Sequence, residues 1–219
     1  MRAPVRRRIS ERLAGAARVV TARDVSRQSW DLIRCGVTTI SWTRGSLWSA
    51  WGPPGSGKST LTLQIAAEAA RALGCGVAIA SLEESPGPPM ARRLALAGLT
   101  HAEDCRIHLR PSLDDLIAEA RAGSVIVVDS LGVGVLTAED LRGLILAGSP
   151  MVLAVLHVTK SGDYKGSTSI IHEVEVEIVV REGGGWESRK NRLGEHVSGQ
   201  IRGVGVAGDQ SEETEVTPC

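Results

Sequence analysis

The sequence predicts an α/β fold: a central, mostly parallel sheet flanked by helices and extended by an antiparallel hairpin near the C-terminus. Strand-like and helix-like segments alternate between residues 46 and 158, as in sheets whose strands are joined by helical crossovers. Phenylalanine is absent and aromatic residues make up only 3% of the chain, so Val, Ile, Leu and Ala must fill the core, which suits a buried parallel sheet. Beyond residue 158, two strand-like segments flank three consecutive glycines, the pattern of an antiparallel hairpin.

The first half of the alternating region begins with an apolar strand over 46–51. This strand runs into a loop of Gly and Pro, and the Ala-rich helix that follows, 58–73, ends at Gly74. The next strand is expected over 77–82 and the next helix over 89–99, because a short apolar run is followed by a longer segment with helical spacing.

The second half repeats the alternation. Helix 112–123 opens with Ser112 as its N-cap and carries an acid, Asp115, at the spacing of a capping box. The strand 124–129 is a continuous β-branched run, which is typical of a central parallel strand. The remaining expected elements are helix 137–148, strand 150–158 and the hairpin strands 176–182 and 186–191.

Composition excludes several classes of protein. With 219 residues, 42% hydrophobic and 23% charged, the chain has the size of one α/β domain. No apolar run approaches the roughly 20 residues that cross a bilayer, and no apolar segment follows the Arg-rich N-terminus, so we expect a cytoplasmic protein rather than a membrane or secreted one. The four cysteines are scattered, which predicts free thiols rather than a zinc site or disulfides.

Charge is unevenly distributed and suggests three regions. Residues 1–51 carry ten arginines against three acidic residues, although the whole chain is neutral. We therefore expect a basic N-terminal arm over 1–27, a core over 28–205 and a disordered acidic tail over 206–219. The arm either contacts nucleic acid or is a solvated segment that lies against acidic surface, and charge alone favours neither.

The strongest motif is GPPGSGKST, which fits G-x-x-x-x-G-K-[ST] between an expected strand and an expected helix. Such a loop turns its backbone N–H groups toward phosphates, and its lysine and hydroxyl reach the terminal phosphates and Mg²⁺. The motif predicts an ATP and Mg²⁺ site. Its residues are Gly52, Pro53, Pro54, Gly55, Ser56, Gly57, Lys58, Ser59 and Thr60.

Acidic residues at strand ends supply the other parts of such a site. Asp129 ends the strand 124–129, where a Walker B carboxylate would accompany Ser59 in holding the metal. Glu83 or Glu84, in SLEES, follows the neighbouring strand and has the chemistry to orient an attacking water. On spacing alone, a solvated pair of glutamates is an equal alternative for these two residues.

In order along the chain, the P-loop, SLEES, VIVVDS, LHVTK and KNRLG resemble the RecA-fold ATPases, and most closely the bacterial RadA (Sms) recombination ATPases. The resemblance covers about residues 45–195 and implies a RecA-like fold. It implies that Glu83 activates water, with Glu84 a close second, and that Asp129 is the Walker B aspartate. It also implies that His157 senses the γ-phosphate and passes the signal to the loop after it.

Lys190 and Arg192 occupy alternate positions of an expected strand, so both side chains lie on one face. The resemblance implies that this pair enters the neighbouring subunit's nucleotide site as a trans-acting finger, which requires a homo-oligomer in the form of a ring or filament. Without the family context, a basic face of a hairpin is the simpler interpretation.

The resemblance also identifies residues 159–170 as a DNA-contacting loop. Its candidate contacts with single-stranded DNA are Lys160, Tyr164, Lys165, Gly166, Ser167 and Thr168. The last three stand where the family has Gly-Pro-Arg, so the arginine is missing here, and a mobile linker remains the alternative. The family's N-terminal zinc module and C-terminal Lon-like domain have no counterpart in this sequence.

These features predict an oligomeric, Mg²⁺-dependent ATPase that acts on single-stranded DNA in recombination, repair or replication. A KaiC-like regulatory ATPase, which controls a protein partner without touching DNA, is the main alternative. A P-loop scaffold that binds nucleotide without hydrolysing it is a third.

Overall fold

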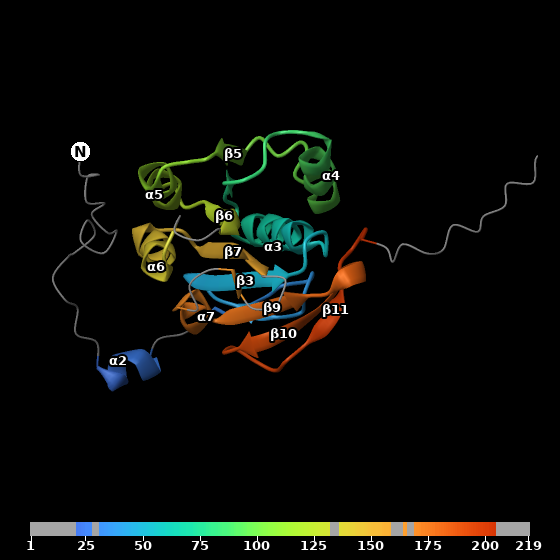
Figure 1. The fold of residues 1–219 in the computed structure, drawn as a ribbon. Coiled ribbons are helices and arrows are strands. Elements are labelled where there is room, and N and C mark those ends of the chain that lie inside the picture. Colours follow the sequence, from blue (N-terminus) through green and yellow to red (C-terminus); the bar gives the residue numbers. More distant parts are fainter. Residues whose placement is uncertain (1–20, 28–30, 132–135, 159–163, 166–168, 205–219) are drawn as a thin grey trace, which may run out of the picture.

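The computed structural model describes residues 21–27, 31–131, 136–158, 164–165 and 169–204. These residues form a twisted sheet with helices on both faces (Figure 1). The N-terminal arm expected over 1–27 is described only from residue 21, and the acidic tail expected over 206–219 lies outside the described residues.

The elements follow the alternation expected from the sequence, with additional elements at both ends and one additional strand within it. The strands are β1 (Ile33–Arg34), β2 (Ser41–Trp42), β3 (Ser46–Gly52), β4 (Val77–Ser81), β5 (Cys105–Leu109), β6 (Val125–Leu131), β7 (Met151–Val158), β8 (Tyr164–Lys165), β9 (Val176–Val180), β10 (Gly185–Asn191) and β11 (Ser198–Gln200). The helices are α2 (Ala22–Arg27), α3 (Lys58–Leu73), α4 (Pro88–Ala97), α5 (Leu113–Arg121), α6 (Ala138–Ala147) and α7 (Ser169–Glu173), with a 3₁₀ turn, η1 (Glu182–Gly184).

The main sheet has nine strands in the order β11-β10-β9-β3-β7-β6-β4-β5, and β8 pairs with β7 outside this path. The strands from β9 to β5 are parallel, whereas β8, β10 and β11 pair antiparallel to their neighbours. Strand β7 lies between β3 and β6, although it follows both in the sequence. The predicted combination of a parallel sheet with an antiparallel hairpin is therefore confirmed.

The hairpin differs from the prediction in its details. The first strand was expected to continue to residue 182 but ends at Val180, because the tight turn η1 begins two residues later. Gly183 and Gly184 of this turn have φ angles of 80° and 83°, which favour glycine. A third strand, β11, extends the hairpin beyond the two expected strands.

Helices cover the two faces of the sheet in separate layers. On one face, Val125 and Val127 of β6 belong to a hydrophobic core that includes residues of α3 and α4, and on the other face Ile126 and Val128 belong to a core that includes residues of α5 and α6. Alternate residues of one strand thus enter opposite cores, which explains its unbroken apolar sequence. Trp42, Trp48 and Trp186 are buried in the core on the α3 side and supply aromatic bulk in a chain that has no phenylalanine.

Local signals define the helix ends as expected. Ser112 accepts a hydrogen bond from the backbone N–H of Asp115, whose carboxylate accepts one in return from the backbone N–H of Ser112. Thr137 and Asp140 form the same reciprocal pair at the start of α6. These boxes fix where α5 and α6 begin.

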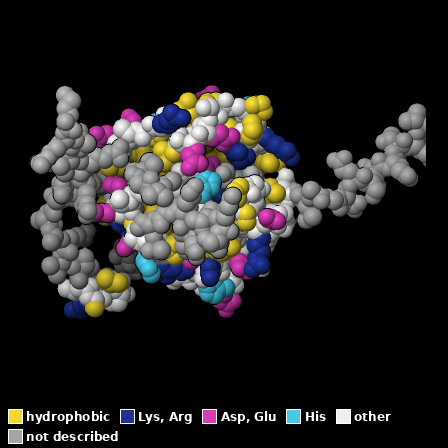
Figure 2. Space-filling view, viewed as in Figure 1, with side chains coloured by type: hydrophobic (Ala, Val, Ile, Leu, Met, Phe, Trp, Pro, Cys, Tyr) yellow, Lys and Arg dark blue, Asp and Glu magenta, His cyan; other side chains and the backbone are white. Residues whose placement is uncertain are grey.

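The described surface mixes charges of both signs. Figure 2 shows basic, acidic and apolar side chains interspersed over one face of the molecule. None of the described helices combines the length and apolar character that crossing a membrane requires. Cys35, Cys75 and Cys105 are free thiols whose pKa values are raised by burial.

Candidate functional site

The Gly-rich loop connects the end of β3 to the start of α3, as the sequence predicted. Gly52 has a φ of 154°, and a Cβ on this residue would lie 1.9 Å from the carbonyl oxygen of Val180. Gly57 has a φ of 97° and precedes α3 without a side-chain cap. Both positions therefore require glycine. Because no side chain caps α3, the backbone N–H groups of its first turn can donate to a ligand.

Two polar side chains of the loop are buried with few partners. Lys58 is 5% exposed, and its Nζ donates a 2.6 Å hydrogen bond to the carbonyl oxygen of Pro53 across the loop. Burial lowers the pKa of Lys58, and the charge of Asp129 opposes this effect. The buried Ser56 hydroxyl has no hydrogen-bond partner within the described residues. The loop therefore retains capacity to bind an oxygen-rich ligand.

The two predicted metal ligands, Ser59 and Asp129, lie close together beside the P-loop. Asp129 lies in β6, and Ser59 of α3 is close enough to its carboxylate to act on its pKa. Burial raises the pKa of Asp129, while the neighbouring Ser59 and the charge of Arg93 act in the opposite direction. A carboxylate and a hydroxyl are hard oxygen ligands, the kind that Mg²⁺ prefers. The described residues contain no cluster of three or more His, Cys, Asp or Glu that would hold a metal by itself.

Strand order brings the remaining candidates to the same edge of the sheet. Gly52 at the end of β3 is in register with His157 of β7, and Asp129 of β6 is in register with Ser81 of β4. Glu83 and Glu84 follow β4 directly. The P-loop, His157, Asp129 and the glutamates thus lie at the carboxyl ends of four adjacent parallel strands, where ligands of such sheets bind.

The two glutamates have different partners. The Oε2 of Glu83 lies 3.1 Å from Nε2 of His157, and its side chain is 55% exposed. Glu84 instead forms an ion pair with Arg93 of α4. Only Glu83 is therefore left facing solvent without a cationic arginine, which favours it over Glu84 as a group that accepts a proton.

Sequence reasoning missed Ser130 and Arg93. The hydroxyl of Ser130 lies 2.6 Å from Nε2 of His157, the same atom that faces the exposed carboxylate of Glu83. Arg93 pairs with Glu84, and its charge acts on Asp129. The available signals were a polar residue directly after Asp129 in an apolar strand, and a pair of arginines in the helix that follows SLEES.

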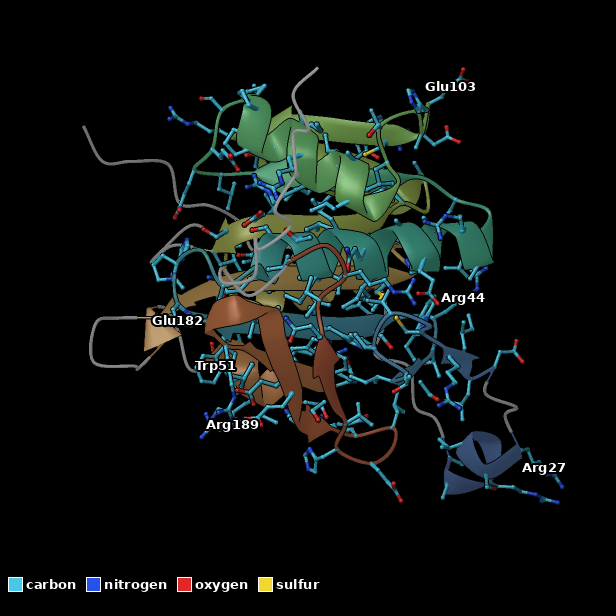
Figure 3. All side chains as sticks on the ribbon, turned by 90° about the vertical axis from the view of Figure 1, so that its right-hand side faces the viewer. Arg27, Arg44, Trp51, Glu103, Glu182 and Arg189 are labelled. Carbon is cyan, nitrogen blue, oxygen red and sulfur yellow. The ribbon has the colours of Figure 1, made fainter. Side chains whose placement is uncertain are left out.

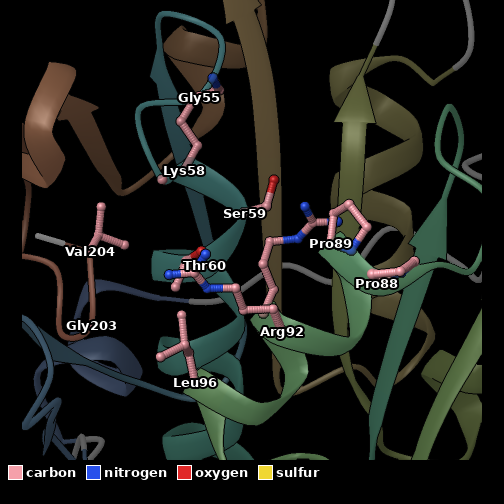
Figure 4. A pocket seen from close by; sticks show the side chains of 12 residues that line it. Gly55, Lys58, Ser59, Thr60, Pro88, Pro89, Arg92, Leu96, Gly203 and Val204 are labelled. Atoms are coloured by element: carbon pink, nitrogen blue, oxygen red, sulfur yellow. The ribbon is translucent and has the colours of Figure 1, made fainter. Parts of the chain in front are cut away.

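A cavity of about 600 Å³ opens beside the P-loop (Figure 4). It extends from Lys58 and Ser59 at the start of α3 to the residues of α4 and the segment 203–204. The walls contributed by α4 and the C-terminal segment are Pro88, Pro89, Arg92, Arg93, Leu96, Gly203 and Val204. The volume and the mixture of apolar walls with a few cationic groups suit a small organic anion.

The structure does not bring Lys190 and Arg192 to the P-loop of their own chain. Strand β10 is antiparallel to β9, so Asn191 pairs with Val176 at the end of β9 that is far from the loop. Lys190 donates hydrogen bonds of 2.9 and 3.0 Å to two carbonyl groups of α7, and Arg192 donates one of 3.0 Å to the carbonyl of His172. Both side chains therefore lie on one side of the strand, as expected from their spacing.

Most of the expected DNA-contacting loop lies outside the described residues, including Lys160, Gly166, Ser167 and Thr168. Tyr164 and Lys165 are described only as the backbone of β8, which pairs with Val158 and His157 of β7. The expected DNA contacts of this loop therefore stay predictions.

A cation–π contact between Arg189 and Trp51 lies on the sheet next to the P-loop. Arg189 lies 5.5 Å from the ring centre of Trp51, the residue that precedes the P-loop, and Trp51 Nε1 donates a 2.7 Å hydrogen bond to Glu177 (Figure 3). A cation over an indole ring is a favourable pair. This contact joins the end of β3 to the hairpin strand that carries Lys190.

Comparisons with known proteins add no assignment. No protein-family model matches the chain, and a search of curated proteins found no significant match.

Proposed function

We propose that this chain is a RecA-like P-loop ATPase that binds ATP with Mg²⁺ and hydrolyses it as a homo-oligomer on single-stranded nucleic acid. The observation that carries the proposal is the convergence at one sheet edge of the Gly-rich loop, buried Lys58 and the neighbouring residues Ser59 and Asp129. The resemblance of the P-loop, SLEES, VIVVDS, LHVTK and KNRLG to RadA-type ATPases gives the proposal its family.

The binding step uses the loop and the adjoining cavity. The backbone N–H groups of Gly55, Ser56 and Gly57 and the N-terminus of α3 attract the phosphates, and Lys58 exchanges its bond with Pro53 for a phosphate oxygen. The cavity of about 600 Å³ has room for the rest of a nucleotide. Ser59 and Asp129 would hold Mg²⁺, which when bound neutralises charge on the terminal phosphates.

The hydrolytic step assigns one role to each remaining residue. Glu83 accepts the proton of the attacking water, because its carboxylate is exposed at the sheet edge and is not neutralised by an arginine. Lys190 and Arg192 of a neighbouring copy stabilise charge on the γ-phosphate, because their distance from their own P-loop leaves only action in trans.

One experiment tests the proposal as a whole. Phosphate release is measured at low, stated salt with and without single-stranded DNA, together with particle size in the presence of a non-hydrolysable ATP analogue. We expect Mg²⁺-dependent turnover that rises with DNA, and a larger particle with the analogue. A protein that shows neither heat protection by ATP nor phosphate release would contradict the proposal.

The regulatory alternative rests on one feature of the sequence. Gly166, Ser167 and Thr168 replace the Gly-Pro-Arg of the resembling family, so the loop lacks its arginine. Turnover that does not respond to DNA at any salt concentration would favour a KaiC-like ATPase that acts on a protein partner. Heat protection by ATP without phosphate release would favour the nucleotide-binding scaffold.

A further inference from the structure

One nitrogen atom at the edge of the sheet has two competing partners. Nε2 of His157 lies 2.6 Å from Oγ of Ser130 and 3.1 Å from Oε2 of Glu83. Ser130 is 3% exposed and belongs to β6, whereas the glutamate side chain is 55% exposed and follows β4. The histidine therefore stands between a fixed buried hydroxyl and an exposed carboxylate.

Because Nε2 either carries a proton or has a lone pair, the tautomer of the imidazole ring decides which of the two partners forms the stronger hydrogen bond. A neutral ring carries its proton either on Nε2 or on Nδ1. With the proton on Nε2, the ring donates to the carboxylate of Glu83, which can only accept. With the proton on Nδ1, the Ser130 hydroxyl donates to Nε2, and the ring lone pair then faces Glu83 without a bond.

We propose that Ser130 is a positioning residue that competes with Glu83 for His157 and so determines whether the Glu83 carboxylate is held by the ring or is free to take a proton from water. The inference rests on the proposed ATPase function, because it assigns the control of the base in that reaction. Ser130 suits this role because its hydroxyl both donates and accepts, and because burial in β6 holds it in place.

The position of His157 in the fold supports this role. Its backbone is in register with Gly52, the first residue of the P-loop, on one side, and with Lys165 of β8 on the other. The ring is therefore carried by a strand that pairs with both the P-loop strand and β8, and it lies next to the buried hydroxyl of Ser130.

The first measurement is made on the unmodified protein. Nitrogen-15 NMR of labelled histidine distinguishes the two neutral tautomers, and we expect the Nδ1–H form for His157, with Ser130 as the donor. A ring held wholly in the Nε2–H form would overturn the proposal, and this result does not depend on whether any variant folds.

The second measurement compares Ser130→Ala with Ser130→Thr. The alanine variant should move His157 to the Nε2–H form and lower kcat for ATP hydrolysis by about tenfold, a fraction of what a general base contributes, with the KM for ATP unchanged. The threonine variant retains a hydroxyl and should recover most of the lost kcat. An unchanged kcat, or a KM effect with kcat unaltered, would overturn the proposal.

Ser149→Ala is the matched control. Ser149 is 2% exposed, and its hydroxyl lies 2.8 and 2.9 Å from the carbonyl oxygens of Ser124 and Met151 at the opposite end of β7, so that its one proton is donated to either of them. The Ser149→Ala variant loses a buried serine hydroxyl that makes no contact with His157, so its kcat should stay at the wild-type value. If Ser130→Ala and Ser149→Ala lose kcat equally, the loss reflects lower stability of the fold, and the positioning role of Ser130 is overturned.

The two proposals fail in different ways. If the wild-type protein neither binds nor hydrolyses ATP, the ATPase proposal fails, while the tautomer of His157 still reports its contact with Ser130. If the wild-type protein hydrolyses ATP and Ser130→Ala does so at the same rate, only the role of Ser130 fails.

Discussion

The ammonium group of Lys58 reaches back across its own loop and donates a 2.6 Å hydrogen bond to the carbonyl oxygen of Pro53. Burial lowers the pKa of this lysine, so the folded protein tolerates rather than favours its charge. In the folded state, Lys58 thus bridges its own P-loop by bonding to a neutral carbonyl oxygen. A negatively charged phosphate oxygen would be a stronger partner for this lysine.

Lys58→Ala should abolish ATP turnover, because the variant lacks the cation that contacts the terminal phosphates. Lys58→Met keeps most of the apolar stem and removes the charge, so the nucleotide-free protein should unfold at or above the wild-type temperature. Thermal unfolding with and without ATP and Mg²⁺ measures both effects. Undiminished ATP protection in either variant would refute the assignment of the phosphate site.

Arg192→Ala should lower ATP turnover by about a thousandfold, the scale of a lost arginine finger, and leave nucleotide binding intact. Arg181→Ala is the matched control, because Arg181 lies on the same hairpin but pairs with Glu187 in an exposed ion pair. Phosphate release and equilibrium ATP binding are measured on both variants.

A mixing experiment separates action in trans from action within one chain. Arg192→Ala supplies an intact P-loop and Lys58→Ala an intact finger, so mixed oligomers of these inactive variants should regain part of the turnover. Mixtures that exchange subunits and remain inactive would rule out the trans mechanism.

Gly52→Ala should destabilise the protein by about 3 kcal/mol, because its Cβ would lie 1.9 Å from the Val180 carbonyl and force β9 away from β3. Gly55→Ala is the control: its φ is 75°, but no atom lies within 4 Å of the added Cβ, so only backbone strain of about 1 kcal/mol remains. Urea unfolding measures both. Equal losses would contradict the close packing of the loop on the hairpin.

Acid should destabilise the fold through Glu119. The Arg106 guanidinium, which donates two hydrogen bonds to this nearly buried carboxylate, lowers its pKa from 4.5 to about 2, against the cost of burial. The unfolded chain therefore binds more protons between these values, so this contribution is complete above pH 4.5 and is lost as the pH falls toward 2.

Glu119→Gln should cost about 2 kcal/mol at neutral pH, the scale of hydrogen bonds to a charged group, and the difference from wild type should shrink in acid. Glu103→Gln, at an exposed position in the turn before β5, is the control. Denaturant unfolding at several pH values gives the curves. Parallel curves for wild type and Glu119→Gln would contradict the assignment.

The sequence was sufficient for elements with strong local signals. The β-branched run before Asp129 became β6, Ser112 capped α5 as expected, and the Gly-rich loop joined β3 to α3. Strand β5 was not predicted, because its residues Cys105–Leu109 mix Arg and His with apolar residues, as an edge strand allows.

The parts of the site that the sequence left out depend on tertiary packing. The contact between Glu83 and His157 joins residues 74 positions apart, and the insertion of β7 next to β6 is not visible in any local pattern. The sequence around Arg93 is that of an ordinary helix, and the sequence around Ser130 is that of an ordinary strand. Their partners, Glu84 and His157, come close to them only when the strands and helices pack together.

The insertion of β7 between β3 and β6 also bears on how the chain acquires its fold. While a ribosome is still making residues 151–158, β6 can already pair with β4, whereas the P-loop strand β3 lacks both of its neighbours in the sheet, β7 and β9. Ordering of this centre must wait for pairings between segments distant in the chain, which are slow to form. The strand that leads into the P-loop therefore gains a native partner strand only after the second half of the core has been made.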